Sequence, residues 1–332
     1  MEFLYEYGLF LAKIATLVLA IALVVGLIAG AAVAKSRPKK GQLQFTDLSK
    51  RYQLMIEDLQ QQMLSKKQLK QWYKAQRVAK NEPKASKLYV IEFNGSMDAR
   101  ETESLREEIT AILAIATKQD EVLLRLESGG GVVHGYGLAA SQLDRLRKHE
   151  VKLTIAIDKI AASGGYMMAC IGNTILSAPF AIVGSIGVIA QLPNFNKLLK
   201  KNNVDFEQFT AGEFKRTVTV FGENTDKGRQ KFQQELEDTH YLFKQFVQQH
   251  RPKLDIDAVA TGEHWFGHQA LDLNLVDSIQ TSDDYIVSQM TEKQVFGVRY
   301  QLRKGIAEKV GMGTASVMSH WWQKLAQHYW IR

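Results

Sequence analysis

The chain has 332 residues, a net charge of +7 and one cysteine. Its length allows one large domain or two modest ones, and the single Cys170 excludes an internal disulfide framework and a cysteine metal site. The basic residues gather around an apolar N-terminal segment and are not interleaved with stacking aromatics. They therefore favour a lipid bilayer over nucleic acid as a partner, and we expect no metal or other cofactor.

The segment Ile14–Ala34 follows a tail over residues 1–13 and contains no charged residue. About twenty residues at roughly 1.5 Å each span the hydrocarbon core of a bilayer, so we expect a transmembrane anchor here. Its A-G-A-A-V-A end could also mimic the cleavage site of a signal peptide. The basic residues Lys35, Arg37, Lys39 and Lys40 follow the segment, and only Lys13 precedes it. Taken alone, this bias places the rest of the chain in the cytoplasm.

Residues 35–85 are expected to form a basic helical linker. Between Phe45 and Lys80 the apolar residues recur at helical spacing, beginning with Leu48, Tyr52, Met55 and Leu59. Two arrangements of this helical stretch remain open. It could form a coiled-coil stalk between anchor and domain, or a surface helix packed on its own domain.

A domain over residues 86–290 is expected to have an α/β fold, because apolar strands alternate with amphipathic helices. The strands are Leu88–Phe93, Val122–Leu126 and Leu153–Ile157. Such alternation predicts parallel β-α units with both faces of the sheet covered. Glycine clusters follow the second and third strands, at the carboxyl ends where ligand sites lie in such sheets.

The second half of this domain gives mixed signals. Ile175–Leu192 is apolar enough for a second membrane span, but a proline and several glycines interrupt it, so we predict short buried strands instead. The further elements expected are a helix at Asn194–Lys201, a strand at Val204–Phe209, a helix at Asp226–Gln249 with Phe232, Leu236, Leu242 and Phe246 inward, and a helix and strand within Thr261–Asp277. A C-terminal extension, residues 291–332, contains an amphipathic stretch that suits either a membrane interface or a packed helix.

Ser163 is a candidate nucleophile, because the run K-I-A-A-S-G-G-Y puts a hydroxyl between a strand and a buried helix. The first turn of that helix offers free N–H groups to a developing oxyanion. Taken by itself, the motif fits an ordinary helix cap better than a nucleophile, and the rest of the chain has to decide. None of the eight histidines sits beside an acidic residue in a triad-like pattern. A lysine can serve as the base only in an apolar site, and Lys215, flanked by Phe214, is a candidate.

Four motifs in order resemble those of the signal peptide peptidase A family of serine peptidases. They are E-S-G-G-G at 127–131, I-A-A-S-G-G-Y at 160–166, V-G-S-I-G-V at 183–188 and G-E-F-K-R at 212–216. The run A-T-G-E-H-W-F-G-H-Q-A-L-D-L-N-L-V-D at 260–277 resembles the closing segment of the family. One anchor and one peptidase unit are most similar to the single-unit branch of that family. Gly129 departs from the pattern, because the family often has proline there, and the loop therefore starts more flexible.

The resemblance implies a crotonase-like fold, shared with the Clp protease, and a Ser-Lys dyad. Ser163 would be the nucleophile and Lys215 the general base. Ser185 would orient the lysine, and the backbone N–H groups of Gly130 and Gly164 would form the oxyanion hole. The resemblance also implies a homo-oligomeric ring in which neighbouring subunits complete each active site, and substrates that are unfolded or membrane-derived peptides, such as cleaved signal peptides.

Two other functions remain open at this point. A crotonase-type enzyme that handles acyl-CoA would use the same paired N–H groups, and a non-catalytic scaffold would keep the fold and organise membrane partners. The resemblance also implies a location in the cell inner membrane. It leaves the side open, because relatives usually face outward whereas the charge bias favours the cytoplasm.

Overall fold

The computed structural model describes residues 5–21, 41–79, 84 and 86–302. The chain divides into two compact units, and one of them, Leu43–Tyr300, holds nearly all of the described residues. The other unit combines Met1–Gln42 with Gln301–Arg332. Within it, residues 5–21 form an exposed helix.

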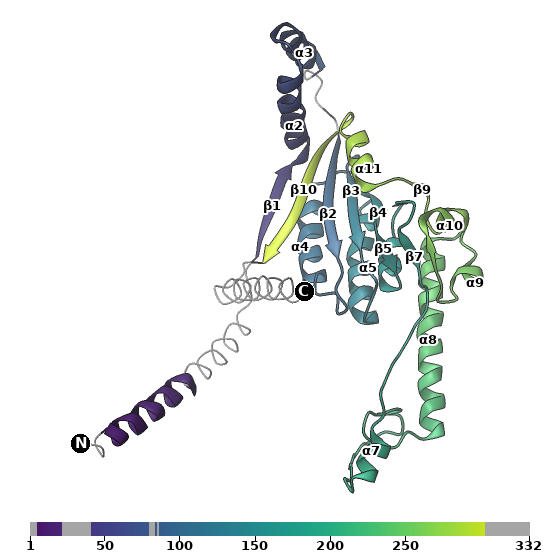
Figure 1. Ribbon diagram of the computed structural model, residues 1–332. Helices are drawn as coiled ribbons and strands as arrows, with labels where there is room; N and C mark the ends of the chain where they lie inside the picture. The colour runs from purple at the N-terminus through teal and green to yellow at the C-terminus, as the bar shows by residue number, and fades with distance from the viewer. Residues whose placement is uncertain (1–4, 22–40, 80–83, 85, 303–332) are drawn as a thin grey trace, which may run out of the picture. The chain divides into compact units, whose positions relative to one another are not determined.

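A seven-stranded sheet forms the centre of the larger unit (Figure 1), and its order is β1-β10-β2-β3-β4-β6-β9. Each pairing from β10 across to β9 is parallel. This mixed α/β architecture with a largely parallel sheet confirms the predicted fold class at that level. The strands are β1 Gly41–Asp47, β2 Ser86–Asn94, β3 Glu121–Glu127, β4 Lys152–Ile157, β6 Thr174–Ser177, β9 Ser278–Ile279 and β10 Lys293–Leu302.

The central strands are apolar on both faces because the sheet separates two cores. In β2, Ile91 belongs to the larger core and its neighbour Val90 to the smaller one. Helices α4 (Thr102–Leu113), α5 (Val133–Lys148) and α6 (Gly164–Ala169) supply side chains to the larger core. Helix α11 (Ser282–Gln289) contributes Tyr285 and Ile286 to the smaller core. Covered faces explain the uninterrupted apolar runs of β2, β3 and β4.

A second, three-stranded sheet lies beside the first and is formed by β5 (Ile160–Ala162), β7 (Ile182–Gly184) and β8 (His264–Phe266). Strand β7 and all but the first residue of β6 fall within Ile175–Leu192, so the prediction of short strands there is confirmed. The predicted strand at Val204–Phe209 is wrong: this segment has no regular structure, and its apolar side chains are exposed rather than paired into a sheet.

The remaining helices are α7 (Asn196–Lys201), α8 (Asp226–His250), α9 (Ile256–Val259) and α10 (Gly267–Asp272). Helix α8 is close to its predicted bounds, but its buried residues are Phe243 and Val247. The prediction that Leu242 points inward is wrong, because the side chain of Leu242 is exposed. The register of the inward face therefore differs from the predicted one by one residue at this turn.

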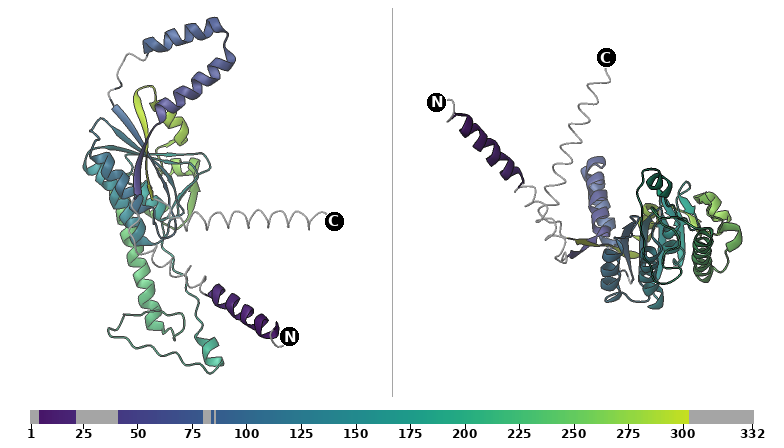
Figure 2. Two further views of the ribbon diagram at one scale, coloured as in Figure 1. Left: turned by 90° about the vertical axis from the view of Figure 1, so that its left-hand side faces the viewer. Right: turned by 90° about the horizontal axis from the view of Figure 1, so that it is seen from below.

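The expected linker contains two helices, α2 (Leu48–Met63) and α3 (Lys66–Ala79), after the strand β1. Both views in Figure 2 show α2 and α3 outside the layers of the sheet. No helix among the described residues is long and apolar enough to cross a membrane. Most of the expected anchor, residues 22–34, and the amphipathic C-terminal stretch lie outside the described residues, so the boundaries given to these segments stay predictions.

Candidate active site

Ser163 stands at a strained turn between β5 and α6. Its φ of +52° and ψ of −118° lie where residues other than glycine are rare. The turn is held by two backbone hydrogen bonds: Ser163 N–H donates to Gly184 O at 2.8 Å, and Met167 N–H donates to Ser163 O at 2.9 Å. Strain of this kind persists where the surrounding structure imposes it, and it clusters at functional sites.

Ser163 lines a cavity of about 280 Å³ whose walls are mostly apolar. The walls come from the glycine loop, from α5 and α6, from the segment after β7 and from the second half of α8. Among the lining side chains are Val133, Met167, Val188, Ile189, Leu242, Phe243 and Phe246. Leu242 is thus exposed to this cavity. An apolar cavity with a few polar groups is the usual form of a ligand site.

The glycine loop after β3 makes close contact with the turn at Ser163. Gly130 has a φ of +87°, and a Cβ atom there would lie 2.7 Å from Gly164 N and 2.8 Å from Ser163 Cβ. Only glycine fits this position. The N–H of Gly130 donates to Ser128 Oγ at 3.0 Å. Gly164 is the first residue of α6, where backbone N–H groups have no partner within the helix.

A buried network that the sequence analysis missed supports this loop. Ser128 Oγ and Tyr136 Oη lie 2.5 Å apart, and Tyr136 O–H donates to Ser96 O at 2.9 Å. A Cβ atom at Gly95 would lie 2.4 Å from Tyr136 Oη, so glycine is needed here as well. Burial raises the pKa of Tyr136, which keeps its hydroxyl protonated and able to donate.

Ser185 is brought next to Ser163 by strand pairing. In the parallel pair β5 and β7, Ala162 is opposite Gly184, so the two serines follow directly after paired residues. Ser185 also has a positive φ, +51°, and its N–H donates to Glu263 O at 2.6 Å. The structure therefore gathers Ser163, Gly164, Gly130 and Ser185 at the ends of adjacent strands.

Lys215 is not part of this group. It is exposed in a loop over residues 212–217, the lysine loop, which contacts the first turns of α8. Glu213 of this loop pairs with Lys227, and a Cβ atom at Gly228 would lie 2.3 Å from Thr217 O. The cavity uses α8 only from Thr239 onward. Between Lys227 and Thr239 the helix rises by roughly 18 Å at 1.5 Å per residue. The lysine loop and Ser163 thus lie beside different parts of α8.

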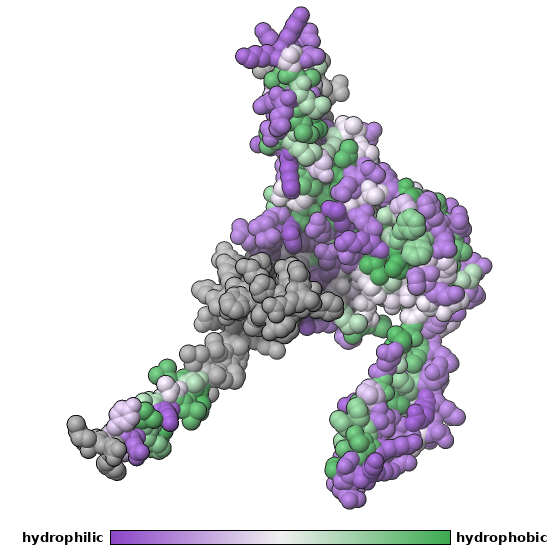
Figure 3. All heavy atoms as spheres, in the orientation of Figure 1, coloured by the Kyte–Doolittle hydropathy of each residue, from purple (hydrophilic) through white to green (hydrophobic). Residues whose placement is uncertain are grey.

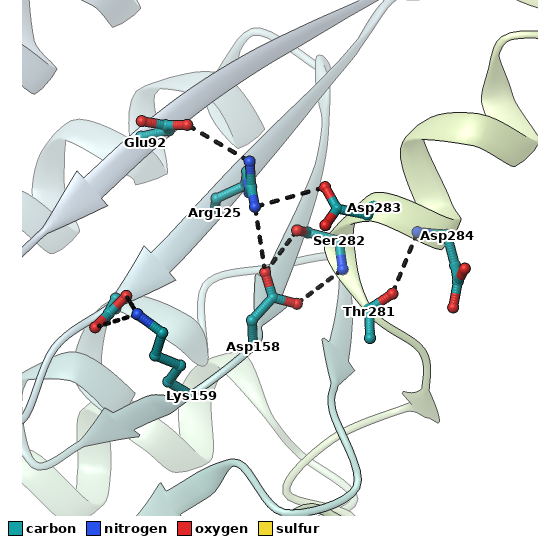
Figure 4. A network of polar contacts seen from close by, with 9 residues as sticks. Glu92, Arg125, Asp158, Lys159, Thr281, Ser282, Asp283 and Asp284 are labelled. Carbon is teal, nitrogen blue, oxygen red and sulfur yellow. Dashed lines mark hydrogen bonds and ion pairs between the residues drawn. The ribbon is translucent and has the colours of Figure 1, made fainter. Parts of the chain in front are cut away.

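A polar cluster fixes the chain just before this site (Figure 4). Asp158, in the connection from β4 to β5, accepts from Ser282 N–H at 2.8 Å and from Ser282 O–H at 2.6 Å. The Arg125 guanidinium lies 3.6 to 3.7 Å from carboxylate oxygens of Glu92, Asp158 and Asp283. The cluster therefore ties the start of α11 to the segment that leads into Ser163.

Comparisons with known proteins identify the family of the chain. A family model described as peptidase family S49 N-terminal matches residues 2–143, and one described as peptidase family S49 matches residues 145–296. A probable protease SohB of Haemophilus influenzae is 53% identical over 93% of this chain and 92% of its own. A probable protease SohB of Buchnera aphidicola from Schlechtendalia chinensis is 51% identical over 87% of this chain and 100% of its own. The chain therefore belongs to peptidase family S49, the serine peptidases of signal peptide peptidase A type.

Proposed function

We propose that this chain is a membrane-anchored serine endopeptidase that hydrolyses unfolded or membrane-derived peptides, such as cleaved signal peptides. Family membership supports the reaction, and the apolar cavity beside Ser163 supports small or apolar side chains near the scissile bond. The fold would be of the crotonase and Clp-protease type. The anchor over residues 14–34 would hold the protein in the cell inner membrane.

One observation supports our account of how the active site is completed: the lysine loop lies beside the first turns of α8, whereas Ser163 faces its second half. A Ser-Lys dyad within one copy would need the two side chains in hydrogen-bond reach. We therefore assign the dyad to Ser163 of one copy and Lys215 of a neighbouring copy. The protein would then act as a homo-oligomeric ring, in which this head-to-tail contact repeats until it closes.

The chemistry follows from these positions. The neutral amine of Lys215 takes the proton from Ser163 Oγ, which attacks the peptide carbonyl carbon and forms a tetrahedral intermediate. Lysine then gives the proton to the leaving amine, and water hydrolyses the acyl-enzyme by the same route. Ser185 would orient the lysine. The N–H groups of Gly164 and Gly130 would bind the oxyanion, which requires Gly130 to exchange its bond with Ser128 Oγ for the substrate.

Subunit complementation tests this function. Ser163→Ala and Lys215→Ala should each abolish turnover of an unfolded substrate by the detergent-solubilised protein. When the two variants are co-expressed, some sites combine Ser163 from one copy with Lys215 from another, and about a quarter of wild-type turnover should return if random mixing occurs in a ring. Inactive mixtures that still assemble would exclude a dyad between copies. Wild-type turnover by either single variant would exclude the dyad itself.

A further inference from the structure

Helices α2 and α3, which together cover residues 48–79, are attached to the sheet through the first turn of α2. Leu48 packs against the smaller core, and Val295 N–H donates to Ser49 Oγ at 2.9 Å. No residue of α2 is buried. The pair is thus a surface element. Beyond its first turn, α2 borders an open hollow that it shares with Phe45 and Thr46 of β1, and Gln61 donates to Tyr73 Oη of α3.

Helix α2 carries an exposed apolar row. Met55, Leu59 and Met63 are spaced four residues apart and so lie on one face. Met55 and Leu59 are half exposed and Met63 is 77% exposed. Figure 3 shows apolar side chains running along α2 between polar ones. Single exposed apolar residues are ordinary, but a continuous row of them indicates a surface that something covers.

Helix α3, which follows after a short turn, is strongly basic. It contains Lys66, Lys67, Lys70 and Lys74 and no acidic residue. All four lysines are exposed, and in the described part of the chain none forms an ion pair. Some exposed lysines elsewhere have carboxylate partners: Lys118 with Glu150, Lys148 with Asp144, and Lys200 with Glu223. The positive charge of α3 is therefore uncompensated by the protein.

We propose that the α2–α3 pair lies on the surface of an anionic bilayer. Its lysines would contact lipid phosphates, and the Met55–Met63 row would enter the boundary between headgroups and acyl chains. Charge complementarity favours this partner over a second copy of the pair, which would bring like charges together. Nucleic acid would leave the apolar row uncovered. The inference goes beyond the peptidase activity and rests only on the proposed membrane location.

Environment-sensitive fluorescence of the full-length protein tests the inference. Gln71 lies among the lysines of α3, and Cys170 is buried, so Gln71→Cys can be labelled selectively. In vesicles of phosphatidylcholine with phosphatidylglycerol, the label should shift to the blue and lose access to aqueous iodide. In phosphatidylcholine alone it should do neither. Molar salt should reverse the shift, because it shortens the screening length from about 10 Å to about 3 Å.

Charge-matched variants separate a local contact from a general charge effect. At about 1 kcal/mol per lysine, Lys67→Gln, Lys70→Gln and Lys74→Gln together should lower the ratio of docked to undocked label on the order of 100-fold. The control, Lys118→Gln, Lys148→Gln and Lys253→Gln together, removes the same charge elsewhere and should leave the ratio unchanged. Met63→Gln should also weaken docking, because it removes an apolar side chain from the row. Met63 is 77% exposed, so the substitution removes no packing within the folded protein.

Three results would overturn the inference. The label could be insensitive to lipid charge, the two triple variants could have equal effects, or burial of the label could increase with the protein-to-lipid ratio and not with the phosphatidylglycerol content. The last result would point to a second copy as the partner. Vesicle flotation and peptide turnover, measured on the same samples, report the anchor and the peptidase separately. A protein that floats and cleaves but fails the label test disproves only the α2–α3 contact.

Discussion

At the residue scale, the backbone of Ser163 stores strain that glycine would release. A positive φ costs a residue with a Cβ atom about 1 to 3 kcal/mol, and the extra entropy of an unfolded glycine offsets part of the gain. We expect Ser163→Gly to raise the free energy of unfolding by about 1 kcal/mol over Ser163→Ala, while both variants are inactive. Thermal unfolding in one detergent compares them. Equal stability of the two variants would show that the turn is unstrained.

The buried Glu108 should make the free energy of unfolding depend on pH. This buried side chain accepts from Tyr300 N–H at 2.7 Å, and burial raises its pKa to about 7, against the opposing influence of that hydrogen bond and of Arg299. A carboxyl whose folded pKa exceeds its unfolded value near 4.5 stabilises the fold at low pH. That stabilisation is lost as pH rises from about 4.5 to 7, by roughly 3 kcal/mol.

Glu108→Gln should therefore stabilise the protein at pH 8 and change little at pH 4, because glutamine keeps the acceptor oxygen and is never charged. Urea unfolding at the two pH values measures this difference. A substitution that acts equally at both would assign the effect to packing instead of ionisation.

At the element scale, Glu121 joins four elements. From β3 it accepts from Thr154 O–H of β4 and from Tyr285 O–H of α11, each at 2.5 Å, and it pairs with Lys293 of β10. Burial alone would raise the pKa of Glu121, but the hydrogen bonds from Lys293, Thr154 and Tyr285 outweigh it, so the pKa is lowered. The stability from this carboxylate is present above its unfolded pKa and is lost as pH falls through the lowered value.

Glu121→Ala should lower the free energy of unfolding by about 3 to 5 kcal/mol, because it leaves Lys293 without its buried partner. Hydrogen exchange should accelerate more for the amides of β10 than for those of β2, the strand that lies between β10 and β3. Uniform acceleration across the sheet would mean that the network does not hold β10 in particular.

The same element scale shows what the sequence could predict. Strands β2, β3 and β4 were predictable because they are buried on both faces and form unbroken apolar runs. Strands β1 and β10 were not, because their polar residues alternate with apolar ones near the edge of the sheet. Val204–Phe209 has the residue types of a strand but no neighbour to pair with, and pairing depends on tertiary structure that propensity does not contain.

At the scale of the whole molecule, the sequence did not predict where Lys215 lies relative to Ser163. Local motifs predicted the serine turn and the glycine loop, since both are built from residues close in sequence to paired strand ends. The Ser128–Tyr136 network was missed because its members look like ordinary core and turn residues. Whether Lys215 lies near Ser163 of the same copy depends on where the 212–217 loop lies relative to α8, and no local pattern encodes that placement.

If the dyad forms between copies as proposed, activity depends on assembly, and Phe209 can test that dependence. Its side chain is 90% exposed in the same irregular segment between α7 and α8 as Lys215, so a subunit contact there would bury it. Phe209→Lys should lower the assembled mass in analytical ultracentrifugation and the specific activity together, and raising the protein concentration should recover both. Phe180→Lys replaces a phenylalanine that is 81% exposed but lies outside this segment, and it should leave both unchanged. Activity kept by Phe209→Lys while the assembled mass falls would argue against a lysine supplied by a neighbouring copy, because catalysis would then not depend on assembly.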